Sequence, residues 1–298
     1  MSTATDTAIA IVGPGAIGTT VAAALHEAGR TPLLCGRTPR GQLTLQDGDR
    51  HVVVPGPVRT DPGQIDRKME LVFLAVKATQ TETASGWLKA LCGPDTVVCV
   101  LQNGVEQLEK VAMHAPRARI VPAVVWFPAQ AQADGSVRLR GDARLSLPDT
   151  PASRVVADGL AGTLCAVDIT ADFLSVAWRK LLQNAVAGLM ALTHRRAGMF
   201  ARPDIAALSL AYLQECLAVA RAEGAKLDDE VPQEILAKFQ AASADLSTSI
   251  LTDREAGRPL EWDIRNGVVS RRARAHGIPT PISDIVVPLL AAASDGPG

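Results

Sequence analysis

The apolar positions at the start of the chain change from one kind of periodicity to another. Residues 8–12 form an unbroken apolar run that stops at Gly13, as expected for a strand buried on both faces. Apolar residues then recur at helical spacing up to Gly29, and residues 32–35 supply a second short apolar strand. This order of strand, helix and strand predicts a βαβ unit.

The rest of the first half continues in the same way. We predict further strands at residues 51–54, 71–76, 96–101 and 120–125, with helices over 81–91 and 105–114. Residues 137–139 and 144–147 are predicted to form a small hairpin around Gly141-Asp142, which closes this half. The pattern therefore predicts an α/β domain built on a doubly wound parallel sheet.

After about residue 170 the apolar spacing becomes almost wholly helical. The predicted helical segments are 173–192, 203–223, 231–241, 247–256, 262–275 and 282–293. We find no internal repeat and no low-complexity linker. The change of periodicity alone therefore predicts two domains, residues 1–169 and an all-α domain over residues 170–298.

Composition and charge narrow the classes of protein further. The chain has 298 residues, long enough for two domains, and its 47% hydrophobic and 20% charged residues exclude disordered and fibrous classes. A formal net charge of −1 offers no general attraction to a polyanion, so nucleic acid is not an expected partner. No apolar run approaches the roughly 20 residues that cross a bilayer, and no membrane partner is expected.

The cysteines indicate the compartment. Five cysteines form an odd set with no C-x-x-C pair, and most fall inside apolar segments (Cys35, Cys92, Cys99, Cys165, Cys216). We interpret them as reduced core thiols rather than as disulfides or metal ligands. The sequence therefore predicts a cytoplasmic protein.

A glycine-rich turn provides the first candidate site. The motif G-x-G-x-x-G lies between the first predicted strand and the first helix, at Gly13-Pro14-Gly15-Ala16-Ile17-Gly18. Gly13 allows a tight turn, Gly15 lets the backbone approach a pyrophosphate, and Gly18 allows close helix–strand packing. We therefore predict a Rossmann-type dinucleotide-binding domain, although a merely tight turn would use the same glycines.

The end of the second strand indicates which dinucleotide binds. An NAD enzyme usually offers Asp or Glu there, but residues 35–38 contain no carboxylate. Arg37, with Arg40 nearby, can pair with a 2′-phosphate through its planar fork, which favours NADP(H) over NAD. The alternative for Arg37 is an ordinary solvated loop arginine.

Two further segments lie at the carboxyl edge of the predicted sheet, where ligands of such sheets bind. Lys77 ends the strand over 71–76, and it either lines the cofactor site or is a surface lysine. Residues 102–104 (Gln-Asn-Gly) follow the next strand, and an amide there can orient a nicotinamide, a substrate or both. Asn-Gly is also common in turns, so a turn is the alternative.

A polar pair within an apolar helix gives the second candidate site. Lys180 and Asn184 are four residues apart and share one face of the predicted helix 173–192. Reduction of a ketone places negative charge on the carbonyl oxygen, and a lysine whose pKa is lowered by burial can protonate it. The alternative is a structural lysine whose ammonium group reaches solvent.

Other polar residues have two plausible roles. Glu261 can hydrogen-bond a substrate and hold Lys180 charged, or it can compensate a helix dipole, as Asp263 can. Residues 247–249 (Ser-Thr-Ser) resemble a helix start. No histidine has a convincing catalytic setting, and no cluster has metal-ligand spacing, so no metal is expected.

Taken in order, these motifs resemble the ketopantoate reductase (2-dehydropantoate 2-reductase) family over nearly the whole chain. The matching pieces are Gly13–Gly18, Val76–Ala78, Gln102–Gly104, Trp178–Asn184, Ser247–Leu251 and Glu261–Gly267. The resemblance implies NADPH-dependent reduction of 2-dehydropantoate to (R)-pantoate, a step toward pantothenate and coenzyme A.

The resemblance also implies roles for individual residues. Lys180 is the general acid, and Glu261 assists it and binds the substrate. Asn103, Asn184 and Ser249 match positions that hold the substrate, with Asn103 also close to the nicotinamide. Arg37 and Lys77 match positions that recognise the 2′-phosphate end of NADP(H).

One departure concerns the substrate. The family often places a second asparagine one turn beyond the first, followed by proline, but here these residues are Gly188 and Leu189. A related reductase of another branched 2-oxo acid is therefore one alternative, and a non-catalytic NADP-binding regulatory protein is another. The sequence does not determine the oligomeric state, for which we consider a homodimer.

Overall fold

The computed structural model describes residues 7–296, which pack into two compact units. The first unit contains the described chain up to Gln102 together with Glu106–Phe173. The second contains Asn103–Val105 and the described chain from Leu174 onward. The sequence analysis placed a boundary near residue 170, and it did not anticipate that Asn103–Val105 packs with the helical unit.

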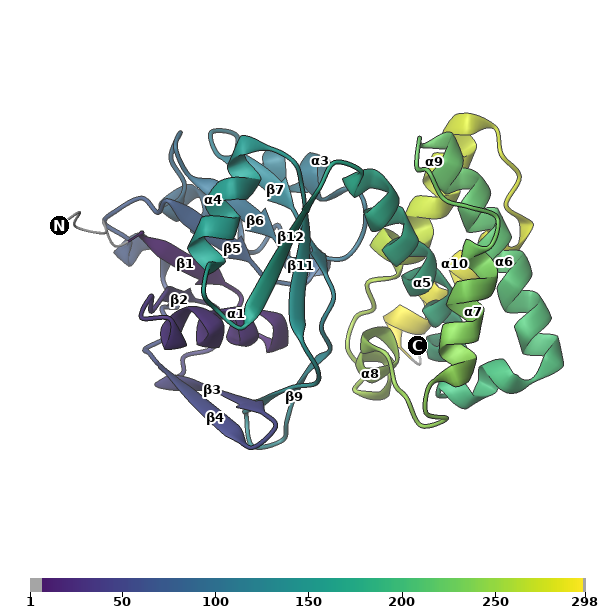
Figure 1. Cartoon of the computed structure of the whole chain (residues 1–298), viewed down its shortest axis with the longest axis horizontal. Coiled ribbons are helices and arrows are strands. Elements are labelled where there is room, and N and C mark those ends of the chain that lie inside the picture. Colours follow the sequence, from purple (N-terminus) through teal and green to yellow (C-terminus); the bar gives the residue numbers. More distant parts are fainter. Residues whose placement is uncertain (1–6, 297–298) are drawn as a thin grey trace. The chain divides into compact units, whose positions relative to one another are not determined.

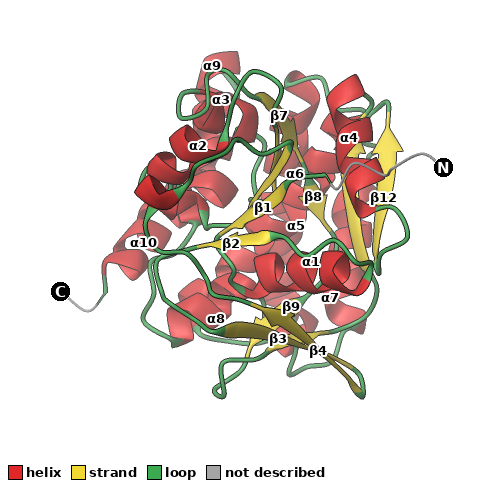
Figure 2. Cartoon of the chain, turned by 90° about the vertical axis from the view of Figure 1, so that its left-hand side faces the viewer, coloured by secondary structure: helices red, strands yellow, loops and turns green. Residues whose placement is uncertain are grey.

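A five-stranded parallel sheet forms the centre of the first unit, in the order β2-β1-β5-β6-β7. Figure 2 shows β1 and β2 side by side at one end of this order. Its strands are β1 (Ile9–Val12), β2 (Leu33–Cys35), β5 (Leu71–Leu74), β6 (Val97–Val100) and β7 (Arg119–Pro122). In β1 the alternate residues point to opposite faces: Ile11 packs in one apolar cluster and Val12 in another. Both faces of the sheet are therefore buried, which explains why these strands are continuous apolar runs.

Helices cover both faces of this sheet. The cluster on one face includes side chains of α1 (Ala16–Glu27) and α4 (Pro151–Leu160). The cluster on the other face includes side chains of α2 (Ser85–Leu91) and Val111 of α3 (Gln107–Ala112). Two short helical turns, η1 (Pro62–Gln64) and η2 (Ala78–Gln80), complete the helices of this unit that lie within the described residues. The predicted doubly wound parallel sheet is confirmed.

The predicted strand at 51–54 belongs to a different sheet. It forms part of β4 (Arg50–Pro55), which pairs antiparallel with β3 (Gln42–Asp47) in a second sheet of order β4-β3-β10-β9, with β9 at Ala129–Ala131 and β10 at Val137–Leu139. The three valines of β4 look like a strand buried on both faces, but Val53 is 47% exposed while Val52 and Val54 are buried. Only one face of β4 is buried, as is common in antiparallel sheets, whereas strands of the central parallel sheet are buried on both faces.

The predicted hairpin of residues 137–139 and 144–147 is wrong. The strand β10 pairs with β3 and β9, whereas β11 (Ala143–Pro148) pairs with β12 (Cys165–Thr170) and β8 (Val124–Val125). Gly141, with φ +76°, turns the chain from one sheet into the other. Helix α4 then connects the parallel strands β11 and β12, and the sequence analysis assigned no element to either α4 or β12.

The described part of the second unit consists of helices and connecting loops (Figure 1). Its helices are α5 (Phe173–Thr193), η3 (Ala197–Ala201), α6 (Pro203–Ala222), α7 (Val231–Ala241), α8 (Ser249–Glu255), η4 (Asp263–Gly267), α9 (Val268–His276) and α10 (Pro281–Asp295). All six predicted helical segments are confirmed. The segment predicted over 262–275 has two parts, because it starts with the π-helical turn η4 before α9 begins.

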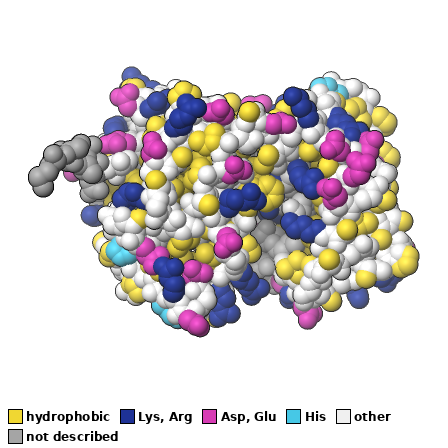
Figure 3. Space-filling model, in the orientation of Figure 1, with side chains coloured by type: hydrophobic (Ala, Val, Ile, Leu, Met, Phe, Trp, Pro, Cys, Tyr) yellow, Lys and Arg dark blue, Asp and Glu magenta, His cyan; other side chains and the backbone are white. Residues whose placement is uncertain are grey.

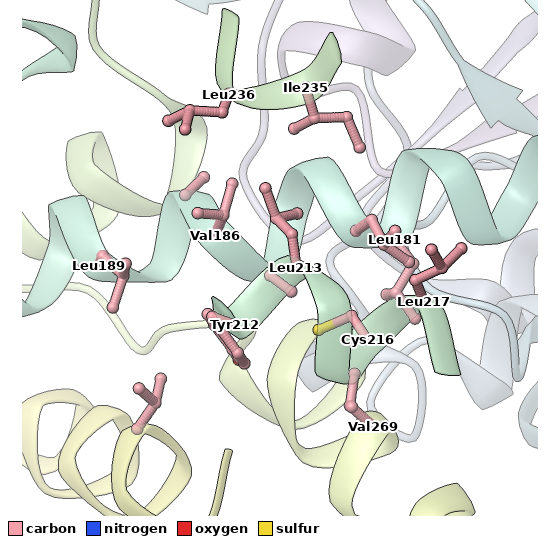
Figure 4. Close-up of a cluster of buried hydrophobic side chains, with 14 of the residues drawn as sticks. Leu181, Val186, Leu189, Tyr212, Leu213, Cys216, Leu217, Ile235, Leu236 and Val269 are labelled. Carbon is pink, nitrogen blue, oxygen red and sulfur yellow. The ribbon is translucent and has the colours of Figure 1, made fainter. Parts of the chain in front are cut away.

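The core of the second unit forms where α5, α6, α7 and α9 meet (Figure 4). Leu181 and Val186 of α5 lie beside Leu213 of α6, with Ile235 of α7 on the other side of α5. Helix α6 is long and apolar enough to cross a membrane by length and composition, which the sequence analysis did not expect of any segment. Its residues Tyr212, Leu213, Cys216 and Leu217 are buried in this core, as in a core helix of a globular domain.

The cysteines and surface charges agree with the sequence analysis. All five cysteines are buried and free, and burial raises the pKa of the Cys35 thiol to about 12 and that of Cys92 to about 11. They are therefore unreactive core thiols. On the face drawn in Figure 3, basic and acidic side chains are interspersed, consistent with a net charge near zero.

Candidate functional site

The first candidate site is the turn between β1 and α1. Gly13 has a φ of +91°, a left-handed conformation that favours glycine. Its N–H donates to the Cys35 carbonyl at 2.8 Å, which ties the turn to the end of β2. A Cβ on Gly13 would lie 2.5 Å from a methyl carbon of Val76 and 2.7 Å from the Val76 nitrogen. The turn can therefore form only with glycine at this position.

Gly15 and Gly18 have different surroundings. Gly15 is exposed, and a Cβ placed on it would meet nothing within 4 Å, so the backbone is open to a ligand. A Cβ on Gly18 would collide with the Gly13 carbonyl oxygen and lie 3.1 Å from the Ile11 side chain, so Gly18 allows α1 to pack on β1. The remaining motif positions, Pro14, Ala16 and Ile17, are half-buried.

The start of α1 is suited to an anion. Its first turn has no acidic residue and its N-cap makes no side-chain hydrogen bond, so the first N–H groups and the positive end of the helix dipole are not neutralised locally. Together with the open backbone at Gly15, this turn fits the pyrophosphate of a dinucleotide. The residues that would hold it are contiguous in the chain.

Arginines are carried by the segments that meet at the end of β2. Arg37 and Arg40 are exposed on the loop that follows this strand. The backbone of Arg59 also pairs there: its N–H donates to the Leu34 carbonyl at 2.8 Å, and its carbonyl accepts from the Gly36 N–H at 2.9 Å. The sequence analysis missed Arg59 because it lies far from Arg37 in the chain and belongs to no motif.

Lys77 and Gln102 follow neighbouring strands of the sheet. Lys77 is half-buried and precedes the helical turn η2 after β5. The Gln102 side chain is 6% exposed, and its Nε2 donates to the Val76 carbonyl at 3.1 Å and to Thr81 Oγ1 at 2.8 Å. The amide of Gln102 therefore holds the loop around Lys77 in place. Asn103, the next residue, hydrogen-bonds instead with Asn184 and Glu261 of the second unit.

The second candidate site joins distant segments within the second unit. Lys180 and Asn184 lie four residues apart on α5. Asn184 Nδ2 donates to Asn103 Oδ1 at 3.2 Å, and Asn103 Nδ2 donates to Glu261 Oε2 in a longer hydrogen bond of 3.4 Å. Glu261 and Asn184 are buried, with 7% and 9% exposure. Residues separated by most of the chain thus form one hydrogen-bonded row.

Lys180 is the titratable amine of this site. Burial, together with the smaller effect of the positive charges of Arg265 and Lys238, lowers its pKa from the ordinary value to about 8. An amine with this pKa is largely protonated at neutral pH and gives up its proton more readily than an exposed lysine. It is therefore suited to acid–base chemistry.

Arg265 is a member of the site that the sequence analysis missed. It is 2% exposed, and its Nη2 donates to Ser249 Oγ at 2.8 Å and lies 3.5 Å from Glu261 Oε2. Ser249, at the start of α8, is thereby linked to Glu261. The available signal was spacing: Glu261 and Arg265 are four residues apart, as in an ion pair on one helical face.

The π-helical turn η4 supports both Arg265 and the Asn103 segment. Gly104 has a φ of +104°, and a Cβ on it would approach the carbonyl oxygen of Ile264 to 3.2 Å, so this glycine lets residues 103–105 pack against the turn. π-Helical turns are rare and occur frequently at functional sites. Asp263 starts this turn and forms an ion pair with Arg271 at the surface, which fits its structural role.

Asn266 occupies the space next to Gly188. A Cβ on Gly188 would lie 2.9 Å from Asn266 Nδ2 and 3.0 Å from a methyl carbon of Leu290. The Asn266 amide is fully buried, and its Nδ2 donates to the Ala185 carbonyl and to Tyr212 Oη, both at 2.9 Å. The glycine noted as a departure in the sequence is therefore needed for packing, and no larger side chain fits there without displacing Asn266.

Other polar groups lie outside these two sites. His276 pairs with Glu223 at the end of α9, with 2.6 Å between Nε2 and Oε1, and Arg179 pairs with Glu234. Ser247 Oγ lies 3.3 Å from Thr252 Oγ1, so its hydroxyl is used within the α8 segment. Within residues 7–296, no group of three His, Cys, Asp or Glu side chains is arranged to hold a metal ion.

Comparison with known proteins gives the family. The family model described as "Ketopantoate reductase PanE/ApbA" matches residues 9–152, and the model of the C-terminal part of the same family matches residues 172–294. A 2-dehydropantoate 2-reductase of Mycobacterium tuberculosis is 58% identical over 98% of this chain and 99% of its own length. One from Caulobacter vibrioides is 37% identical over 97% of this chain and 99% of its own length.

Solved structures have the same fold. A dimeric ketopantoate reductase from Staphylococcus aureus has a TM-score of 0.87 and 27% identity, covering 98% of this chain and all of its own. A ketopantoate reductase of the PanE/ApbA family from Ralstonia eutropha also has a TM-score of 0.87, with 28% identity, covering 96% of this chain and 98% of its own. The family is one of NADPH-dependent oxidoreductases, and this chain belongs to the ketopantoate reductase family.

Proposed function

We propose that this protein reduces 2-dehydropantoate to (R)-pantoate with NADPH, a step toward pantothenate and coenzyme A. The observation that supports this most directly is the hydrogen-bonded row Asn184, Asn103 and Glu261, with an amine, Lys180, one turn before Asn184 on α5 whose pKa is lowered to about 8. These groups are suited to holding a hydroxylated 2-oxo acid and protonating its carbonyl oxygen. The relatives with 58% and 37% identity over nearly the whole chain are 2-dehydropantoate 2-reductases.

The glycine turn is the proposed site of NADP(H). The pyrophosphate would bind at Gly13–Gly18, against the open backbone of Gly15 and the first turn of α1. Arg37 and Lys77 would bind the 2′-phosphate end, and Asn103 would orient the nicotinamide as well as the substrate. When bound, this cofactor supplies the hydride that is added to the keto carbon.

Each polar residue of the second unit has a proposed task in the reaction. Lys180 donates its proton to the keto oxygen as the carbonyl becomes an alkoxide, so that a 2-hydroxy acid is released. Asn103, Asn184 and Ser249 hold the polar groups of the substrate. Glu261 binds a substrate hydroxyl and fixes Asn103 through their hydrogen bond. The lowered pKa of Lys180 makes it a better acid than an ordinary lysine.

The experiment that tests this function is a direct assay of NADPH oxidation with 2-dehydropantoate, repeated with NADH. We expect turnover with NADPH and a clear preference for it over NADH. A protein that binds NADPH but oxidises it with no 2-oxo acid would instead be a non-catalytic NADP-binding protein.

A different branched 2-oxo acid is the second candidate substrate. Gly188, packed against Asn266 where the family often has a second asparagine, is the observation in its favour. Ranking a panel of branched 2-oxo acids by kcat/KM distinguishes the two candidates, because specificity is the ratio of these values. 2-Dehydropantoate should rank first, and a larger kcat/KM for an acid without the hydroxyl would favour the second candidate.

We further infer that the protein acts in the cytoplasm as a homodimer. Five buried free thiols are compatible with a reducing compartment. The dimeric ketopantoate reductase from Staphylococcus aureus, which has the same fold, supports the dimer. Light scattering after gel filtration should give twice the mass of 31.3 kDa, and a mass of one chain across the working concentration range would contradict the dimer.

A further inference from the structure

Arg265 is a deeply buried arginine with few polar partners, Ser249 and Glu261. It is 2% exposed, and neighbouring residues on its segment, Ile264 and Val268, are 7% and 0% exposed. Within residues 7–296 its Nε is buried and finds no hydrogen-bond partner. A buried guanidinium is costly unless it has a specific use, and replacing such a group by an apolar side chain often stabilises a protein. The stability of the fold therefore does not explain why an arginine lies here.

The contacts of Arg265 all lead to the proposed substrate site. Its Nη2 donates to Ser249 Oγ at 2.8 Å, so the Ser249 hydroxyl keeps its own proton to donate elsewhere. The same nitrogen lies 3.5 Å from Glu261 Oε2, which accepts the hydrogen bond from Asn103. One guanidinium thus fixes two residues that come from α8 and from the segment before η4.

Two cations act on the amine of Lys180. The charged groups that shift its pKa are both cations, Arg265 and Lys238, and both act in the direction expected of a like charge. Glu261 pairs with Arg265 and offsets one of these charges. Cations that are buried, as Arg265 is, favour a ligand that brings a negative charge of its own.

Asn266, the residue after Arg265, uses its amide nitrogen in the helical core. Its Nδ2 donates to Ala185 and Tyr212 inside the helical core, and it occupies the space above Gly188. The family often has an asparagine one turn beyond Asn184, where this chain has Gly188. The amide nitrogen of Asn266 does not replace this asparagine, because it is bonded within the core. The site therefore has Gly188 rather than an amide donor at this position of α5, and it contains a buried cation, Arg265, on η4.

We propose that Arg265 is a positioning and specificity-determining residue: it orients Ser249 and Glu261, and its charge selects a 2-oxo acid with an ionised carboxylate over an uncharged ketone. This inference rests on the proposed function. The planar fork of Arg265 can hold Ser249 and Glu261 together, whereas a lysine supplies the charge without that geometry.

The test compares the 2-oxo acid with its neutral primary amide as substrates of the same enzyme. In Arg265→Gln the charge is lost and a similar volume is kept. We expect kcat/KM for the acid to fall roughly 10- to 100-fold, the range for losing a hydrogen-bonded charge, while kcat/KM for the amide changes much less. The fall should appear mainly in KM, because binding of the carboxylate is a ground-state interaction as well.

Two further variants separate charge from geometry. Arg265→Lys should restore most of the preference for acid over amide but not the normal KM, because the amine cannot hold Ser249 and Glu261 at once. Ser249→Ala removes one hydroxyl from an exposed residue and leaves Arg265 in place, so it should fold even where the arginine variants do not, and it should raise KM for the acid with little effect on kcat. Its effect should be smaller in an Arg265→Lys background, because the two residues act together.

Arg271→Gln is the matched control. Arg271 is also an arginine paired with a carboxylate, Asp263, and it lies six residues further on at the surface. Its loss should leave the ratio of acid to amide unchanged, because exposed pairs contribute little.

The outcomes are distinct. Equal losses for acid and amide in Arg265→Gln would show that Arg265 is only the structural counterion of Glu261 and would overturn the proposal while the proposed function stands. An unchanged KM in Ser249→Ala would overturn both the proposal and the task given to Ser249, while the proposed reaction stands. A wild-type enzyme that reduces no 2-oxo acid would overturn the proposal and the proposed function together.

Discussion

The glycine turn of the first unit and the polar site of the second unit are built in opposite ways. The turn uses backbone from contiguous residues, and what matters there is the absence of side chains: Gly13 and Gly18 have no room for a Cβ, and Gly15 has open space. The polar site uses side chains from four segments, and what matters is that Asn103, Glu261 and their partners meet. A site built from contiguous backbone can be recognised from a motif, whereas a site built from convergent side chains can be completed only by folding.

The difference predicts different failures on mutation. Adding atoms should damage the turn, and removing atoms should damage the polar site.

Removal of the amine in Lys180→Ala should have the largest effect on turnover. A general acid typically contributes on the order of 10²- to 10⁴-fold, so kcat should fall by that factor while the Kd for NADPH stays the same. Single-turnover kinetics and a fluorescence titration with NADPH measure the two quantities. Arg179→Ala is the control, because this neighbour on α5 forms only a surface ion pair with Glu234. Near-normal turnover in Lys180→Ala would remove Lys180 from the mechanism.

Adding a single methyl group to the turn should abolish binding at one glycine and only weaken it at another. Gly13→Ala combines a φ of +91° with a collision at Val76, so we expect a loss of about 1–3 kcal/mol of stability and no measurable NADPH binding. Gly15→Ala meets no atom of the protein, so its Tm should stay near normal while the Kd for NADPH rises, about tenfold for each 1.4 kcal/mol of steric cost. Similar Tm and Kd values for the two variants would contradict the role given to the turn.

Binding of the 2′-phosphate should depend on several basic residues, so the loss of one of them should cost less than the loss of Lys180 costs the reaction. Arg37→Ala should lower the ratio of kcat/KM for NADPH to that for NADH roughly 10- to 100-fold, the range for one charge-assisted hydrogen bond. Arg40→Ala and Arg59→Ala provide the comparison, because both arginines lie on segments near the end of β2. If Arg37→Ala keeps its preference and one of these variants loses it, that residue and not Arg37 binds the phosphate.

The pH dependence of kcat/KM should show the pKa of Lys180 and the effect of its charged neighbours on that pKa. The lysine must be protonated to act as an acid, and its pKa is lowered to about 8, so kcat/KM should be level just below pH 8 and fall about tenfold per pH unit above it. In Arg265→Gln the repulsion between Arg265 and protonated Lys180 is gone, so the pKa of Lys180 should rise and the fall in kcat/KM should move to higher pH. If the fall stays at the same pH, the charge of Arg265 does not contribute to the lowered pKa of Lys180.

Some features of the fold were predictable for a local reason. The parallel strands are buried on both faces, and the helices of the second unit keep their apolar spacing, so each leaves a clear pattern. The strand at 51–54 and the hairpin at 137–147 were misjudged because pairing depends on partners elsewhere in the chain. Nothing local to Val137–Leu139 shows that its partners are β3 and β9.

The polar site shows the same limit. Lys180, Asn184 and Glu261 could be singled out as polar residues in apolar segments, and their roles remain predictions that the variants above test. Arg265 escaped notice because an arginine near a helix start is ordinary until its burial is known, and Arg59 because only backbone pairing brings it to β2.

The sequence by itself determined the βαβ order, the glycine turn and the helical second half, since these depend on residues close together in the chain. Only the tertiary structure decided which sheet β4 and β10 join, that residues 103–105 pack with the helical unit, and that a buried guanidinium links Ser249 to Glu261. The physical reason is that burial and long-range contact arise from the summed packing of the whole unit, and no short stretch of sequence contains that information.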